Sequence, residues 1–245
     1  MPSLNRLAGA AALAAAAVMS VSACGSSGSS TSALSGLSAD QIVQKSVANL
    51  KAASSVRITG KVVSSGQAIA VDLTDVAAQG CQGTISLAAG ATSASSAVSG
   101  TASIVEVHST VYMKLDESFF KSAGLPASDF SQVDGKYIKL TSTSNLANFA
   151  QLCNPSTLAG AFAKEDTGFV KAGAGTINGQ PALGFKQPKN ASNGTVYVTR
   201  SATPEIVRIA GPANEGTIDF SDYNAHATIT APPASTVIDG SQFGL

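Results

Sequence analysis

Apolar and polar residues alternate along most of the chain after residue 55. In the first such run, Val56, Ile58 and Val62 share one side while Arg57 and Lys61 share the other. A period of two residues in the apolar pattern is typical of a strand with one buried and one solvent-exposed face. The pattern recurs at 69–74, 84–87, 104–107, 111–115 and 136–140, and then at 168–171, 182–186, 195–200, 205–210, 217–220 and 227–230. It predicts one antiparallel sheet of about 10–11 strands.

A helical period precedes the first strand. Ser38 and Gln41 have the spacing of a capping box, in which the two side chains satisfy backbone N–H groups at a helix start. Apolar residues then recur at helical spacing from Ile42 to about Ala53. The sequence therefore predicts an amphipathic helix from about residue 38 to 53.

Two later segments also favour helix, at 117–123 and 145–163, and Pro155 is expected to begin a second helix inside the longer one. Asn178-Gly179 predicts a two-residue hairpin turn between strands. Taken with the strands, these elements predict an α+β fold, in which helices pack on one face of a curled antiparallel sheet.

The first residues have the pattern of an export signal. Arg6 precedes an apolar run of about 15 residues, Leu7 through Val21, which is shorter than the roughly 18 to 20 residues that span a bilayer. The string Val21-Ser-Ala-Cys-Gly25 follows and resembles the lipobox of bacterial lipoproteins, so Cys24 is expected to carry a diacylglyceryl group. The alternative is an ordinary secretory signal with a cysteine near the cut by chance.

The lipobox divides the chain into three parts. Residues 1–23 are expected to be a signal peptide, 24–37 the lipidated cysteine with a Ser/Gly tether, and 38–245 a single folded domain. Residues 25–36 have too little apolar surface to order themselves, and a flexible coil of this length spans roughly 20 Å. The domain would then work close to the outer surface of the cell membrane.

Two cysteines remain in the folded part, Cys81 and Cys153. In an oxidising compartment such a pair commonly forms a disulfide, which would close a loop of about 72 residues. A metal site or a catalytic thiol are the alternatives, but neither cysteine has a histidine or second cysteine at ligand spacing. We expect a structural disulfide.

Charge and composition exclude some classes of binding partner. The formal net charge is zero and no basic block occurs, so neither nucleic acid nor polybasic attraction to lipid headgroups is expected. Tryptophan is absent and aromatic residues make up 5%, so the core is built largely from Val, Ile, Leu and Ala. Small side chains leave room for a ligand, or reflect a GC-rich genome.

Motifs for catalysis are weak. His108 and His226 lie outside any metal motif, and Ser118-Phe-Phe-Lys121 matches S-x-x-K without the partner elements of a penicillin-binding protein. The acidic pair Glu165 and Asp166 is most simply a solvated turn. Sequons begin at Asn190 and Asn193 but have no expected use in a bacterial lipoprotein. We expect no enzyme activity, no cofactor and no metal.

Several short strings follow one another along the folded part. They are Val111-Tyr-Met-Lys-Leu115, Ile177-Asn-Gly-Gln180, Val196-Tyr-Val-Thr-Arg200 with Glu205-Ile-Val-Arg-Ile209, and Ile218-Asp-Phe-Ser-Asp-Tyr223 with Ala227-Thr-Ile-Thr-Ala-Pro-Pro233. Taken in this order, they resemble the LppX and LprG family of actinobacterial lipoproteins. The resemblance implies a LolA-like half-barrel whose curved sheet and helices enclose an apolar cavity for the acyl chains of lipids or lipoglycans.

The residues expected to line that cavity are apolar positions of four of the first five strands, with ordinary packed core as the alternative at each. They are Val56, Ile58, Val62, Ile69, Val71, Leu73, Ile85, Leu87, Met113 and Leu115. The chain departs from the family in its cysteine pair, in its Ala/Gly/Ser-rich segment 88–103 and in lacking tryptophan.

The resemblance implies a monomeric lipid carrier, anchored through Cys24 at the extracytoplasmic face of the cell membrane, that carries or presents a lipid. A structural or interaction module with the same fold and no cavity is the alternative.

Overall fold

The computed structural model describes residues 34–64, 66–89, 98–157, 167–189, 194–212 and 215–245. All of these belong to one compact unit, Ser32–Leu245. Cys24 with its lipobox, Glu165, Asp166 and the asparagines at 190 and 193 lie outside the described residues, as does most of the tether.

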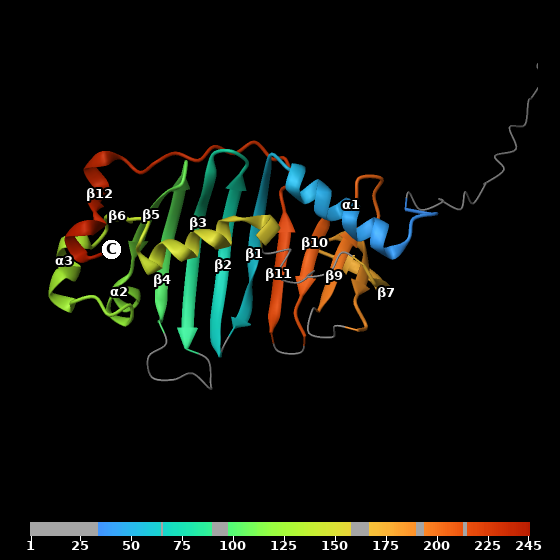
Figure 1. Cartoon of the computed structure of the whole chain (residues 1–245), viewed down its shortest axis with the longest axis horizontal. Helices are drawn as coiled ribbons and strands as arrows, with labels where there is room; N and C mark the ends of the chain where they lie inside the picture. Colours follow the sequence, from blue (N-terminus) through green and yellow to red (C-terminus); the bar gives the residue numbers. More distant parts are fainter. Residues whose placement is uncertain (1–33, 65, 90–97, 158–166, 190–193, 213–214) are drawn as a thin grey trace, which may run out of the picture. The chain divides into compact units, whose positions relative to one another are not determined.

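Twelve strands form one sheet, and helices lie beside it (Figure 1). The strands of the first half are β1 (Ser55–Ser64), β2 (Gln67–Val76), β3 (Gly80–Ala89), β4 (Gly100–Val107), β5 (Thr110–Leu115) and β6 (Tyr137–Lys139). Those of the second half are β7 (Val170–Ile177), β8 (Gln180–Lys186), β9 (Thr195–Thr199), β10 (Ile206–Ala210), β11 (Gly216–Ser221) and β12 (Val237–Asp239). The helical elements are α1 (Ala39–Ala52), α2 (Glu117–Ser122), η1 (Ala127–Asp129), α3 (Phe130–Val133), η2 (Asn145–Cys153), η4 (Ala234–Thr236) and η5 (Gly240–Phe243).

The strand order across the sheet is β12-β6-β5-β4-β3-β2-β1-β11-β10-β9-β8-β7. Strands β1 to β6 are successive antiparallel neighbours, and so are β7 to β11. The two halves meet where β1 pairs with β11 and Ile58 lies opposite Phe220. The predicted α+β fold with one large antiparallel sheet is confirmed.

Two details of the sheet differ from the prediction. Residues 227–230 form no strand, and Ile229 packs on the outer face of the sheet, where it joins Val76 and Val105 in a small second cluster. The Ile229 N–H donates to the Gln79 side chain at 3.0 Å instead of to a strand ladder. The sheet also gains β12, which pairs parallel to β6.

Helix α1 begins as predicted. The Ser38 hydroxyl accepts from the Gln41 N–H and the Gln41 side chain accepts from the Ser38 N–H, which is the expected capping box. Ile42, Val43 and Leu50 are buried on one side of the helix. The amphipathic helix predicted from residues 38 to 53 is therefore confirmed.

The segment that begins at residue 145 is helical as predicted, but its first part is a 3₁₀ helix. Residues 145–153 form the 3₁₀ helix η2, capped by the Ser144 hydroxyl, and residues 155–157 are helical again after Asn154. Leu158 and the rest of the predicted helix lie outside the described part of the chain.

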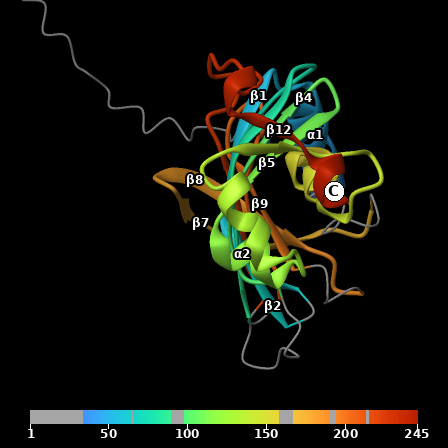
Figure 2. The ribbon, with the colours of Figure 1, turned by 90° about the vertical axis from the view of Figure 1, so that its left-hand side faces the viewer.

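The helices cover the inner face of the sheet in separate pieces (Figures 1 and 2). Helix α1 contacts β7, β9 and β10, whereas η2 contacts β2, β3 and β4, and α2 packs on β4 and β5. No helix in the described ranges is long and apolar enough to cross a membrane. The cover of the inner face is thus built from segments that are not neighbours in sequence.

Two glycines on the inner face allow neighbouring strands to approach closely. Gly60 and Gly83 both have φ of +153°, and a Cβ at either position would run into the backbone of the neighbouring strand. Glycines inside strands are typical of sites where a sheet bends or another backbone approaches closely.

Candidate functional site

The strand register places all ten predicted cavity residues on one face of the sheet. Across β1 to β5 the residues line up in rows, because each residue lies beside its Cα partner on the next strand. Ile58, Leu73 and Met113 share one row with Gly83 and Ile104. Val71, Ile85 and Leu115 share the next row, and Val62, Ile69 and Leu87 share the one beyond it.

These ten side chains are covered. Eight are buried, and Val62 and Ile69 are partly buried and pack against the same core cluster. The cluster continues over the second half of the sheet through Phe220, Ile218 and Phe185. Apart from one row, the inner face is therefore a continuous apolar surface, as the alternation predicted.

One row of the inner face is different. It runs Val56, Asp75, Cys81, Glu106 and Val111 across β1 to β5, so two carboxylates flank a cysteine on an otherwise apolar face. This acidic row was missed in the sequence. The signal was present, because Asp75 continues the inward positions of β2 and Glu106 interrupts an apolar run in β4.

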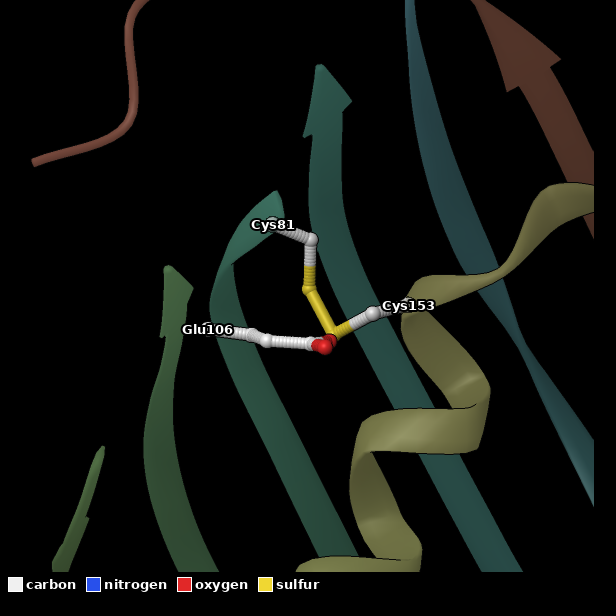
Figure 3. Close-up of side chains that lie close together, drawn as sticks. All are labelled: Cys81, Glu106 and Cys153. Carbon is white, nitrogen blue, oxygen red and sulfur yellow. A yellow bond between two sulfur atoms is a disulfide. The ribbon is translucent and has the colours of Figure 1, made fainter. Parts of the chain in front are cut away.

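Cys81 forms a disulfide with Cys153 at the end of η2, with Cα atoms 5.6 Å apart. This is the pairing predicted from the sequence. Figure 3 shows the Glu106 carboxylate directed at the sulfur of Cys153. The disulfide thus ties the 3₁₀ cover to the middle of the sheet, beside a carboxylate.

A pocket of about 530 Å³ opens beside the acidic row. It lies where the last turn of α1, the β2–β3 turn and the end of η2 meet, and Asp75, Glu106 and Cys153 are part of its wall. Leu50 and Lys51 of α1 line it as well. None of the ten predicted cavity residues lines this pocket.

Burial perturbs both carboxyl groups of the acidic row. Desolvation, reinforced by the charge of Glu106, raises the pKa of Asp75 from 3.8 to about 6. Desolvation also raises the pKa of Glu106. Neither carboxylate has a hydrogen bond or an ion pair with the described part of the protein.

We expect Asp75→Asn to stabilise the protein at neutral pH. The folded-state pKa of Asp75 lies above its unfolded value, so ionisation costs stability as the pH rises from about 4 to 6, and the full cost applies above that. Since the group is partly solvated, the expected gain in the free energy of unfolding at pH 7.5 is about 1 kcal/mol. Urea unfolding at pH 7.5 and pH 3.5 measures it, and the gain should vanish at the lower pH.

Asp72 on the outer face of the same strand is the matched control. Its hydrogen bond from Arg57 lowers its pKa, so Asp72→Asn should cause a small loss at pH 7.5 instead of a gain. Equal effects of the two substitutions would contradict the electrostatic account of Asp75.

The other candidate residues lie apart from this site. His108 and His226 are exposed, and Lys121 of the S-x-x-K match forms an ion pair with Glu117 on the surface of α2. Ser118 is exposed on the same helix. None of these four side chains lines the pocket.

Comparison with known proteins gives structural likeness alone. No family model matches the chain, and no curated protein matches it in sequence. The crystal structure of LprF from Mycobacterium bovis is similar to this chain with a TM-score of 0.49 and 15% identity, covering 80% of this chain and 97% of that one.

An uncharacterised conserved protein from Thermus thermophilus is similar at a TM-score of 0.34 and 9% identity, covering 83% of this chain and 99% of its own. LprF is a member of the family that the sequence strings resemble.

Proposed function

We propose that this chain is a membrane-anchored envelope protein that holds the acyl chains of a lipid or lipoglycan between its sheet and the helices covering it. The observation that carries the proposal is the continuous apolar inner face, which ten side chains of β1, β2, β3 and β5 share and which separate helices cover.

The cover is suited to opening because it is built from separate helical segments. The Ser144 cap is a local contact at the start of η2, and the Cys81–Cys153 disulfide ties the end of η2 to β3, so apolar packing through residues such as Phe149 holds the part between them. A 3₁₀ helix also has poorer hydrogen-bond geometry than an α-helix, so its middle costs less to displace. An acyl chain would enter by moving η2 away from β2 and β3 while the disulfide keeps its end in place.

The energy of such binding comes from burial. Each methylene removed from water contributes about 0.8 kcal/mol, so ten methylenes contribute about 8 kcal/mol before the cost of moving the cover. This contribution from burying methylenes does not require polar contacts that are specific to one headgroup. A cavity of this kind therefore needs no sequence motif, in keeping with the weak motifs found.

The outer face offers little for an apolar ligand. In the described part of the chain, Val63 and Val170 are the large apolar side chains that are exposed, and β1 and β2 present Arg57, Lys61 and Asp72 outward. An acyl chain is thus expected on the inner face.

Membrane attachment completes the proposal. Cys24 would carry the lipid anchor, and the Ser/Gly tether of about 20 Å would keep the monomeric domain beside the extracytoplasmic face of the membrane. A carrier at that distance can collect a lipid from the surface without a membrane-spanning segment.

Native mass spectrometry with organic extraction tests the proposal. The unit from Ser32, which lacks the anchor cysteine and keeps the buried Leu34, should copurify with a lipid of defined mass when it is expressed in a lipid-containing host. An apo mass that stays unchanged when lipid vesicles are added would overturn the carrier function.

Two tryptophan substitutions on opposite faces of β2 test on which face of the sheet the lipid binds. Ile69→Trp adds bulk at a partly buried inner position and is expected to lower lipid occupancy at least fivefold, whereas Ala70→Trp on the opposite face should leave it unchanged. Thermal unfolding of both variants controls for folding. Equal occupancy in the two would show that lipid lies elsewhere.

The second candidate function is that of an interaction module. Strand β7 is at the edge of the sheet, and seven of its eight residues are exposed, among them several Gly and Ala residues. Free edges of this kind accept an added strand from a partner. A lipid-free protein with a reproducible crosslink through Lys171 would favour this function.

A further inference from the structure

Three metal-ligating side chains converge beside the pocket. The Sγ atoms of Cys81 and Cys153 and a Glu106 carboxylate oxygen all lie within 4.8 Å of one another (Figure 3). They come from β3, η2 and β4, so the folded chain alone brings them together. We propose that, once the disulfide is reduced, Cys81, Cys153 and Glu106 bind a divalent metal ion of the zinc class.

The geometry needs little rearrangement. Zinc holds thiolate sulfur at about 2.3 Å in a tetrahedral arrangement, which places two sulfurs nearly 4 Å apart. The Cα atoms of the two cysteines are 5.6 Å apart, so rotation of their side chains is enough to separate the sulfurs to that distance. Glu106 lies directly opposite Cys81 in the β3–β4 register and is already on the same face.

The donor set selects the metal. Two thiolates and one carboxylate favour Zn²⁺ over Mg²⁺ and Ca²⁺, which prefer oxygen ligands. The Glu106 carboxylate is free to bind, since no hydrogen bond or ion pair engages it within the described ranges. Glu106 and Cys153 both line the pocket, so a fourth ligand, water or Asp75, can reach the ion from there.

Disulfide and metal exclude each other. A trialkylphosphine reduces the Cys81–Cys153 disulfide. The phosphine and one water molecule convert the disulfide into two protein thiols and form the phosphine oxide, so phosphorus is oxidised and sulfur is reduced. Metal binding then releases the two thiol protons to solvent as the two metal–sulfur bonds form. The cluster therefore has an oxidised state that ties η2 to the sheet covalently and a reduced state in which the metal makes the link. This inference is independent of lipid binding.

Cobalt titration tests the site. The full chain carrying Cys24→Ala, so that Cys81 and Cys153 are its only cysteines, is reduced with phosphine and desalted without air. One equivalent of Co²⁺ should give a thiolate-to-cobalt charge-transfer band, and Zn²⁺ should abolish it. The oxidised chain should give no band, and Cys153→Ser should lose it after reduction. A reduced chain without the band, or an oxidised chain with it, overturns the proposal.

The variant Glu106→Gln tests whether the carboxylate contributes to metal binding or whether the two cysteines alone bind the ion. We expect it to weaken Zn²⁺ binding at least tenfold, while Glu205→Gln, which changes a partly buried glutamate just before β10, leaves the affinity unchanged. Circular dichroism reports whether each reduced chain is folded. The same titration in denaturing urea should be at least tenfold weaker than in buffer, and equal affinity in urea or in Glu106→Gln would refute the site.

Discussion

Replacing Cys81 and Cys153 together by alanine is expected to lower the free energy of unfolding by about 4 kcal/mol. The disulfide joins residues 72 positions apart, and in the chain-entropy model a loop of that length restricts the unfolded chain by about this amount. Both cysteines are buried in the core cluster, so the two alanines also remove packed atoms. Urea unfolding without reductant measures the change.

The parent protein is its own control. Added phosphine should lower its stability toward that of the double variant, and the double variant should not respond to phosphine. A loss below 1 kcal/mol would mean that the disulfide does not constrain the unfolded chain in the expected way.

The second large effect is expected from Phe220→Ala, at about 3–5 kcal/mol of lost stability. Phe220 is 1% exposed and lies opposite Ile58, where β11 joins the two halves of the sheet. Truncation leaves a cavity at this junction, which the curled strands on either side cannot close without moving the register. Urea unfolding again provides the measurement.

Ser221→Ala changes the next residue, which faces away from the core, and should cost less than 0.5 kcal/mol. A double-mutant cycle with Ile58→Ala should show a coupling of at least 0.5 kcal/mol, because the two side chains share the junction. Purely additive effects would contradict direct packing across β1 and β11.

The face of each strand could be predicted because side chains in a strand alternate strictly. Val56, Ile58, Leu73 and Met113 were assigned to one side from period alone, and all of them lie on the inner face. The prediction failed at 227–230, where the same alternation packs on the outer face without strand pairing. Alternation of apolar and polar residues indicates that one side of a segment is buried. It does not indicate whether the backbone pairs with a neighbouring strand.

The candidate site was less accessible to sequence reasoning. Asp75 and Glu106 are 31 positions apart, and each looks like an ordinary polar residue in its own strand. Their relation exists only through Cys81, which lies between them in the sheet register. The same register places Glu106 beside the disulfide, and no local pattern contains that information.

The sequence by itself determined the capping box of α1, the inward side of β1, β2, β3 and β5, the Asn178-Gly179 turn and the pairing of the two remaining cysteines. Tertiary structure decided which strands are neighbours and that β12 runs parallel to β6. It also decided that separate helices cover the inner face and that two carboxylates meet a disulfide beneath it. The physical reason is that capping, alternation and turn geometry act over a few residues, whereas register and burial depend on contacts between residues far apart in the chain.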